Sequence, residues 1–271
     1  MKEDLQERFI DIGVNLLHSA FDRDREEVIA QAAQAGVSPL IITGTSLAVS
    51  RRAADYGAGS GGRLWCTAGV HPHEASTWSA STGEALGELC RREEVKAVGE
   101  CGLDYCRDFS PRPSQRRCFE EQLALACERG LPAFLHQREA FDDFYGILKN
   151  AAPLLPGFVV HCFTGTQKEL EAFLDLGGCI GLTGWICDER RRGDLPRLAP
   201  LIPPDRLLLE TDAPFLKPRD LRGGGSRNVP ANLAHIAAVV ARLCGKSRET
   251  LARETFSASC RFFGLEGNLR K

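Results

Sequence analysis

The chain has 271 residues, of which 43% are hydrophobic and 26% are charged. This ordinary globular balance excludes wholesale disorder, a fibrous repeat and a small disulfide scaffold. The 34 basic and 36 acidic side chains give a formal net charge of −2, which excludes a protein that coats duplex DNA through a broad basic face. Any contact with nucleic acid is therefore expected to be local.

Short apolar runs rich in Val, Ile and Leu alternate with amphipathic segments along the chain. The runs are continuously apolar, which is typical of parallel strands covered on both faces. The expected strands are residues 9–14, 39–43, 64–70, 95–100, 133–136, 158–161, 179–183 and 206–210.

Helices are expected between these strands. Capping-box patterns at residues 24–27, 81–84 and 166–169 predict three helix starts, and an apolar stripe over 114–129 that ends at Gly130 predicts a fourth helix. Two more helices are expected near 231–244 and 248–263. Eight strands, each followed by a helix, predict an α/β fold, a (β/α)8 TIM barrel that forms a single domain over residues 1–271. A doubly wound sheet is the alternative, but the first strand lacks a glycine-rich phosphate turn after it.

The cysteines and the N-terminal segment indicate the compartment. Eleven cysteines are an odd number and contain no C-x-x-C pair, which favours a reducing compartment. The first residues alternate charges where a signal peptide needs an apolar run, and no stretch approaches the roughly eighteen apolar residues of a membrane span. We therefore expect a soluble, cytoplasmic monomer with no membrane contact.

Histidines and acids fall at the carboxyl ends of the expected strands. Because these ends share one rim of a parallel barrel, residues far apart in sequence converge there. Imidazoles and carboxylates together are what a divalent metal site requires. A single such His is more often structural than a metal ligand, and for His71 alone the two interpretations are even, whereas the whole set is hard to explain by chance. The set is His71, Glu100, His136, His161 and Asp212.

The other three histidines stay outside this set. His73 lies near the rim and is only a candidate substrate contact. His18 and His235 are expected at the surface.

Six segments keep a fixed order along the chain. They are DIGVNL (11–16), GVHPH (69–73), GECGLD (99–104), HCFTG (161–165), GWICDER (184–190) and ETDAP (210–214). Together they resemble the TatD family of metal-dependent deoxyribonucleases, from about Phe9 to Phe263. The resemblance implies a barrel of the metallo-dependent hydrolase type and 3′→5′ exonuclease activity on single-stranded DNA and RNA ends. It also implies Mg²⁺ as the metal and a role in the repair or turnover of damaged DNA ends.

The resemblance also implies roles for individual residues. Glu100 matches a metal-bridging carboxylate, His136 and His161 match metal ligands, and Asp212 matches the acid that binds metal and handles the water proton. Glu100 and Asp212 are thus the expected catalytic residues, with Asp212 as general base. His71 and Glu210 match positions that either support the metal ligands or face the substrate. The ligand chemistry leaves Mn²⁺ and Zn²⁺ open, and leaves open whether one or two ions bind.

Two positions depart from the family pattern. Many relatives open with Asp-x-His-x-His, whereas Gly13 and Asn15 occupy the two histidine positions here. This predicts a lean or substrate-assembled metal site, with Asn15 as a weak oxygen ligand at most. Relatives also read Arg-Asn-Glu-Pro where this chain has Val229 after Arg227 and Asn228, so a basic side chain nearby is expected to be less well fixed.

Local basic and aromatic groups are expected to hold a single-stranded end. Arg138 is the arginine most expected at a phosphate, and Trp185 is expected to stack on a base. Phe163 is undecided between stacking and core packing. The stretch 190–192 lies among acids and is interpreted as an exposed helix start. The loop 217–227 follows the last strand and carries four basic residues against Asp220: Lys217, Arg219, Arg222 and Arg227.

Three other functions stay open. An amidohydrolase acting on a small amide or ester shares the barrel, but often uses a carboxylated Lys where this chain has Glu100. A metal-free binding protein would keep only the pocket. Removal of an amino acid from aminoacyl-tRNA would use similar groups.

Overall fold

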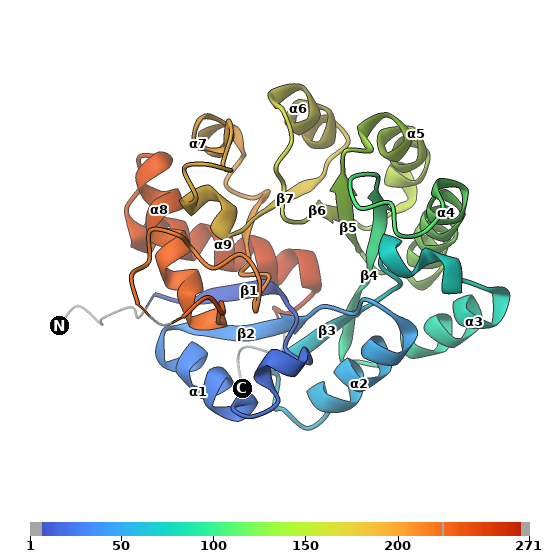
Figure 1. The fold of residues 1–271 in the computed structure, drawn as a ribbon, viewed down its shortest axis with the longest axis horizontal. Coiled ribbons are helices and arrows are strands. Elements are labelled where there is room, and N and C mark those ends of the chain that lie inside the picture. Colours follow the sequence, from blue (N-terminus) through green and yellow to red (C-terminus); the bar gives the residue numbers. More distant parts are fainter. Residues whose placement is uncertain (1–6, 224, 267–271) are drawn as a thin grey trace.

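The structure is a computed structural model that describes residues 7–223 and 225–266. In this part of the chain, eight strands form one sheet in chain order, and each neighbouring pair is parallel (Figure 1). The predicted barrel class is confirmed. The strands are β1 (Phe9–Val14), β2 (Val37–Ile42), β3 (Leu64–Ala68), β4 (Val95–Asp104), β5 (Ala133–Arg138), β6 (Phe158–Val160), β7 (Cys179–Leu182) and β8 (Leu207–Leu209).

The first and last strands meet just beyond the end of β8. The Asp212 N–H donates to the Gly13 carbonyl at 2.9 Å, and the Asn15 N–H donates to the Ala213 carbonyl at 2.8 Å. These bonds make the barrel nearly closed. They also carry Asn15 and Asp212 to the same rim as the other strand ends.

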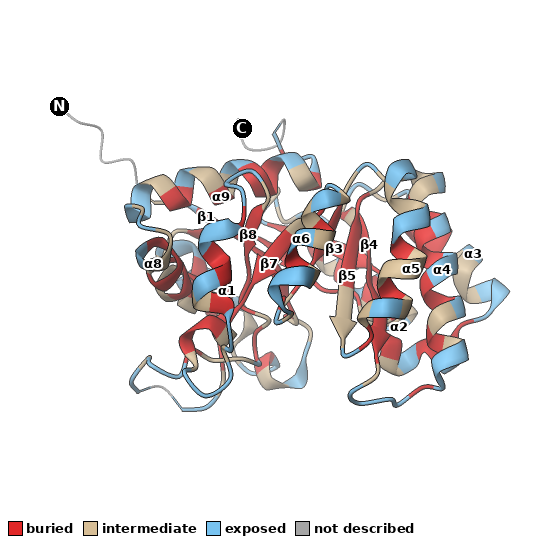
Figure 2. Ribbon diagram, turned by 90° about the horizontal axis from the view of Figure 1, so that it is seen from above, coloured by how far each residue is buried: buried red, intermediate tan, exposed pale blue. Residues whose placement is uncertain are grey.

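Helices surround the strands and bury one face each, as Figure 2 shows by the buried residues on their inner sides. No helix in the described residues is both long and apolar enough to cross a membrane. The helices around the barrel are α1 (Arg25–Gln34), α2 (Leu47–Gly57), α3 (Ala80–Leu89), α4 (Arg112–Arg129), α5 (Phe141–Ala151), α6 (Gln167–Asp175), α7 (Leu195–Leu198) and α8 (Leu233–Leu243).

The last helix, α9 (Arg248–Phe263), covers one end of the barrel. Its Ala258 and Phe263 are buried in a cluster with Ile12, Phe134 and Leu208 from the strands. In Figure 2 the tip of β5 points away from α9. The carboxyl ends of the strands are therefore left free to form a pocket at the opposite end.

One predicted capping box is confirmed at the start of α6. The Glu169 N–H donates to Thr166 Oγ1 at 3.3 Å, and the Thr166 N–H donates to Glu169 Oε2 at 2.5 Å. The predicted end of α4 at Gly130 is also confirmed, with φ of 63° at that glycine.

The other two predicted capping boxes are wrong. Asp24 precedes α1, but its carboxylate makes no cap bond because both of its oxygens accept from Arg227. The helix α3 begins before Ser81, since the Ser79 side chain caps it. Local patterns located both helices but not the side chain that starts each one.

Candidate metal centre

A cavity of about 610 Å³ opens at the carboxyl ends of the strands. It brings together eight of the predicted site residues, although they come from all parts of the chain. They are Asn15, His71, Glu100, His136, Arg138, His161, Trp185 and Asp212.

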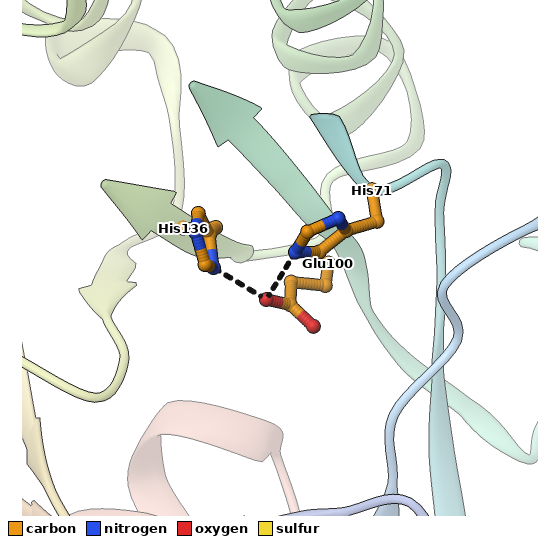
Figure 3. A group of neighbouring side chains, drawn as sticks. All are labelled: His71, Glu100 and His136. Atoms are coloured by element: carbon orange, nitrogen blue, oxygen red, sulfur yellow. Dashed lines mark hydrogen bonds and ion pairs between the residues drawn. The ribbon is translucent and has the colours of Figure 1, made fainter. Parts of the chain in front are cut away.

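Glu100, in β4, lies at the centre of a cluster of imidazoles. Its Oε1 atom is 2.7 Å from His161 Nε2, 2.8 Å from His136 Nδ1 and 3.3 Å from His71 Nε2. Figure 3 shows His71 and His136 both directed at this one oxygen. His136 Nδ1 and His161 Nε2 are 3.3 Å from each other. One carboxylate oxygen and two ring nitrogens thus share a single point.

His71 faces this point as a hydrogen-bond donor. Its Nδ1 accepts the backbone N–H of His73 at 3.1 Å, so the network places the proton of the neutral ring on Nε2. Burial lowers the pKa of His71, which favours that neutral ring. The position of this nitrogen close to Glu100 and His136 would suit a metal ligand. When Nε2 carries the proton, however, it has no lone pair to donate to a metal. His71 therefore holds the Glu100 carboxylate in place.

His161 and His136 each have a carboxylate behind the ring. Glu210 Oε2 lies 3.3 Å from His161 Nδ1, and Asp104 Oδ2 lies 3.5 Å from His136 Nε2. A carboxylate in this position takes the far N–H and turns the lone pair of the near nitrogen toward the centre. His136 Nε2 is buried and finds no hydrogen-bond partner of good geometry within the described residues.

The three central donor atoms fit a divalent cation. Adjacent ligands of an octahedral ion at about 2.1 Å are about 3 Å apart, and the observed edges are 2.7, 2.8 and 3.3 Å. A carboxylate oxygen with two imidazoles suits Mn²⁺ and Zn²⁺, and suits Mg²⁺ when substrate oxygens complete the shell. The donor set therefore matches the predicted metal site.

The electrostatics of the cluster point the same way. Burial opposes the charge on Glu100, but the charge of His161, the interaction with His71 and the hydrogen bonds from His136 and His161 hold the pKa of Glu100 well below the usual range. Burial also opposes the charge on His161, yet Glu100 and Glu210 hold the pKa of His161 well above its usual value. Positive charge is thus strongly favoured beside Glu100, where a cation would exchange with protons.

Asp212 faces the same cavity from the seam of the barrel. Its Oδ1 accepts from Asn15 Nδ2 at 2.8 Å, so the amide nitrogen of Asn15 is directed at it. Burial, followed by the negative charges of Glu100 and Glu210, raises the pKa of Asp212 to about 7. Asn15 thus positions the carboxyl group of Asp212.

Gly13 has a physical reason to differ from the family histidine. A Cβ atom there would lie 2.5 Å from Glu210 Oε2, and one at Gly181 would lie 2.6 Å from Glu210 Oε1. Glu210 fills the space between these glycines and accepts the Cys162 N–H at 2.5 Å. A side chain at position 13 would displace the carboxylate that orients His161.

Arginines and aromatic rings form the wall of the cavity. The guanidinium groups of Arg138 and Arg191 lie over the Trp185 ring, at 5.7 and 5.2 Å from its centre. Arg191 also lines the cavity, so the interpretation of 190–192 as only an exposed helix start is wrong for this residue. Phe163 is 4% exposed and belongs to the core, whereas Phe215 is 48% exposed and lines the cavity.

Arg227 is not brought to the cavity. Its guanidinium donates to both carboxylate oxygens of Asp24, at 2.9 and 2.5 Å, and to the Ala20 carbonyl at 2.6 Å. The expectation that Val229 leaves a basic side chain poorly fixed is therefore wrong for Arg227, because Asp24 fixes it. Lys217 is also occupied, since it donates to the Gly225 carbonyl at 2.6 Å within its own loop.

Sequence reasoning missed several cavity residues. His18 and His73 both line the cavity, although neither was placed in the predicted set. Asp104, whose Oδ2 is 2.8 Å from His73 Nε2, lies four residues after Glu100 in β4. Residues two and four apart share one face of a strand, so this alternation could have identified Asp104.

Comparison with known proteins agrees with this geometry. Residues 10–264 match the family described as TatD related DNase. A protein of Erwinia billingiae named 3′-5′ ssDNA/RNA exonuclease TatD is 50% identical over 257 residues, which are 94% of this chain and 98% of the relative. A Klebsiella pneumoniae protein of the same name is 49% identical over 260 residues, 95% of this chain and 98% of the relative.

Solved structures show the same relationship. The crystal structure of YJJV, a TatD homolog from Escherichia coli k12, superimposes with a TM-score of 0.88 at 31% identity, covering 96% of this chain and 99% of the other. The family match spans nearly the whole barrel and includes every residue of the candidate metal centre. The chain therefore belongs to the TatD related DNase family.

Proposed function

We propose that this protein is a metal-dependent 3′→5′ exonuclease that hydrolyses phosphodiester bonds at the ends of single-stranded DNA and RNA. The observation that carries the proposal is the convergence of Glu100, His136 and His161 on one point inside an arginine-walled cavity. The names of the half-identical relatives support the same reaction and substrate. The repair role implied by the resemblance stays a prediction.

The central cluster would hold the metal ion. Glu100 Oε1, His136 Nδ1 and His161 Nε2 are the proposed protein ligands, and Mg²⁺ is the proposed metal, with Mn²⁺ and Zn²⁺ as alternatives that two imidazoles also suit. When bound, a divalent cation supplies an acidified water and neutralises a phosphoryl oxygen. His71 donates its N–H to Glu100, while Glu210 keeps the His161 ring turned toward the centre.

The remaining cavity residues act on substrate and water. Asp212, positioned by Asn15, accepts the proton of the attacking water as general base. Arg138 and Arg191 present guanidinium groups beside Trp185, where they can bind phosphate oxygens. Phe215 offers an exposed ring at the cavity edge on which an unpaired base can stack.

The overall charge supports a single-stranded end in preference to a duplex. The net charge is −2, so the protein has no large positive excess for tracking duplex backbones. Positive charge is instead concentrated at the cavity, which is lined by three arginines: Arg107, Arg138 and Arg191. We also propose that the protein is a monomer in the cytoplasm. All eleven cysteines are free thiols, which supports a reducing compartment.

The decisive experiment follows oligonucleotides labelled at the 5′ end, single-stranded or duplex, in the presence of Mg²⁺, Mn²⁺ or Zn²⁺. We expect stepwise shortening of the single strands from the 3′ end, and loss of that activity on chelation. Glu100→Gln and His161→Ala should abolish it while circular dichroism and thermal melting show a folded protein. Full activity in either variant would overturn the assignment of the site.

The same assay separates the alternative functions. A cyclic amide or an aminoacyl-tRNA turned over faster than any oligonucleotide would favour an amidohydrolase or a deacylase. Oligonucleotide binding that survives chelation, with no nucleotide released under any metal, would indicate a binding protein.

A further inference from the structure

A second group of metal-binding side chains lies outside the cavity. Cys187 ends the short 3-10 helix η4 (Gly184–Cys187), Asp220 lies in the loop after β8, and His235 lies in α8. One ligand atom of each lies within 4.8 Å of the other two. His235 Nε2 and Asp220 Oδ1 are 2.8 Å apart. None of the three lines the cavity of the metal centre.

We propose that Cys187, Asp220 and His235 form a zinc site separate from the catalytic metal centre. A sulfur, a ring nitrogen and a carboxylate oxygen are the donors that Zn²⁺ takes in proteins, whereas Mg²⁺ avoids thiolates. The thiolate and the carboxylate together match the charge of the ion. The set differs from the catalytic cluster by its sulfur, so the two centres select different metals.

The burial of the three residues fits a site with one open position. Cys187 is 3% exposed, so the sulfur approaches from the protein interior. The side chains of His235 and Asp220 are 30% and 37% exposed, so they close the site on the solvent side. A tetrahedral ion with three protein ligands takes water as its fourth, and the partly exposed side provides that water.

The site would fasten the loop after β8 to the rim of the barrel. The three ligands come from η4, from this loop and from α8, which are separate in sequence. Trp185, two residues before Cys187, lines the catalytic cavity. Arg219, next to Asp220, lies 3.7 Å from Asp188, the residue after Cys187. An ion here therefore holds the loop against the Trp185 edge, and its role is structural.

Cobalt tests this site directly, because Co²⁺ bound to a thiolate gives a near-ultraviolet charge-transfer band that oxygen and nitrogen ligands do not give. The full-length protein is stripped of metal and titrated with Co²⁺. We expect the band in the wild type and its loss when Zn²⁺ is added. Cys187→Ser should remove the band, and His235→Gln or Asp220→Asn should weaken Co²⁺ binding at this site at least about tenfold.

Matched variants separate the site from the catalytic centre. Cys162 lines the catalytic cavity, so Cys162→Ser tests whether the charge-transfer band comes from a thiolate in that cavity. Both Cys162→Ser and Glu100→Gln should keep the band. A wild type without the band, a band that survives in Cys187→Ser, or a band lost in Cys162→Ser would each overturn the proposal. A wild type without the band overturns the proposal even if a variant fails to fold, and the measurement does not depend on nuclease activity.

A second readout follows the loop itself. Arg219 and Arg222 are sites for trypsin in the loop that the ion would fasten, whereas Lys217 is not, because Pro218 follows it. Zn²⁺ should slow cleavage at these residues in the wild type but not in Cys187→Ser. Equal rates with and without Zn²⁺ in the wild type would contradict the fastening role.

Discussion

Asp104 lies behind the His136 ring and contacts the metal centre without facing its central point. Its Oδ2 lies 2.8 Å from His73 Nε2 and 3.5 Å from His136 Nε2, while its Oδ1 accepts the N–H groups of Cys106 and Arg107 at 3.0 and 2.8 Å. Asparagine can keep the Oδ1 bonds but not the charge behind the ring. Asp104→Asn therefore isolates the electrostatic role of this carboxylate.

We expect Asp104→Asn to lower metal affinity about 10- to 100-fold, because the His136 nitrogen becomes a weaker and less well oriented ligand. The measurement is nuclease activity as a function of Mg²⁺ concentration. The half-saturating concentration should rise, and activity should return toward wild type at high Mg²⁺. Asp108→Asn, which removes a surface partner of Arg112, is the control and should not shift the curve. An unshifted curve for Asp104→Asn would contradict the role.

Phe215 is an exposed aromatic residue at the cavity on which an unpaired base can stack. It lines the cavity, and its ring lies edge-on to His18 at 5.3 Å. Stacking of one base on an aromatic ring contributes about 1–3 kcal/mol, so Phe215→Ala should raise KM for single-stranded DNA about 5- to 160-fold with a smaller change in kcat. Leu154→Ala removes an exposed apolar side chain elsewhere and should leave KM unchanged. Equal KM values for the two variants would exclude stacking at Phe215.

Contacts between elements decide the role of Arg227. Its paired bonds to Asp24 connect the loop after β8 to the start of α1. Since the pair is partly exposed, we expect a small but measurable stabilising coupling in a double-mutant cycle of Arg227→Ala and Asp24→Ala, measured by urea unfolding. KM for single-stranded DNA should stay unchanged in both variants. A raised KM in Arg227→Ala without coupling to Asp24 would instead place Arg227 on the substrate.

The elements themselves were largely predictable from the sequence. Continuous apolar runs located all eight strands within a few residues. A strand that is buried on both faces is apolar along its whole length, and this can be recognised without knowing which strands pair with it. The structure extends β4 to Asp104, past the predicted end at Glu100, where glycine and aspartate interrupt the apolar run. Asp24 has the right spacing for a cap, but a distant arginine competes for its oxygens, and local sequence carries no trace of that competition.

The site was predictable for residues in strands and much less so for residues in loops. Glu100 and His136 lie in the carboxyl-terminal halves of β4 and β5, and His161 directly follows β6, so barrel topology alone brings them to one rim. Arg191 and Phe215 reach the cavity through the path of their loops, which no periodic pattern encodes. His18 is exposed, as predicted, but its place at the edge of the cavity was not foreseen for the same reason.

A buried carboxyl group lies at the seam that closes the barrel. Asp11 in β1 is fully buried, and its Oδ1 accepts the Thr211 N–H at 2.9 Å and the Gly13 N–H at 3.3 Å. Burial raises the pKa of Asp11 to about 8, against the opposing effect of the bonds from Thr211 and Gly13, and the charge of Glu210 adds to the rise. We therefore expect the acid in the seam between β1 and β8 to keep its proton at neutral pH.

This gives the barrel a stability that falls as pH rises. The unfolded chain loses the Asp11 proton near its ordinary pKa of 3.8, whereas the folded chain keeps it up to about pH 8. Between these values folding retains a proton that unfolding releases, so this group lowers the free energy of unfolding by about 1.4 kcal/mol per pH unit. The contribution of Asp11 to the free energy of unfolding is fully present below pH 3.8 and is lost above about pH 8.

Asp11→Asn should remove this slope, because the amide keeps the shape and the acceptor oxygen but cannot ionise. Urea unfolding from about pH 5 to about pH 9 should show the variant gaining on the wild type by about 1.4 kcal/mol per pH unit until about pH 8, with no further gain above it. Asp205→Asn, at a largely exposed position, is the control and should run parallel to the wild type. Parallel profiles for Asp11→Asn as well would show that the seam carboxyl is already ionised in the folded barrel, held by the donors of Thr211 and Gly13 in spite of its burial.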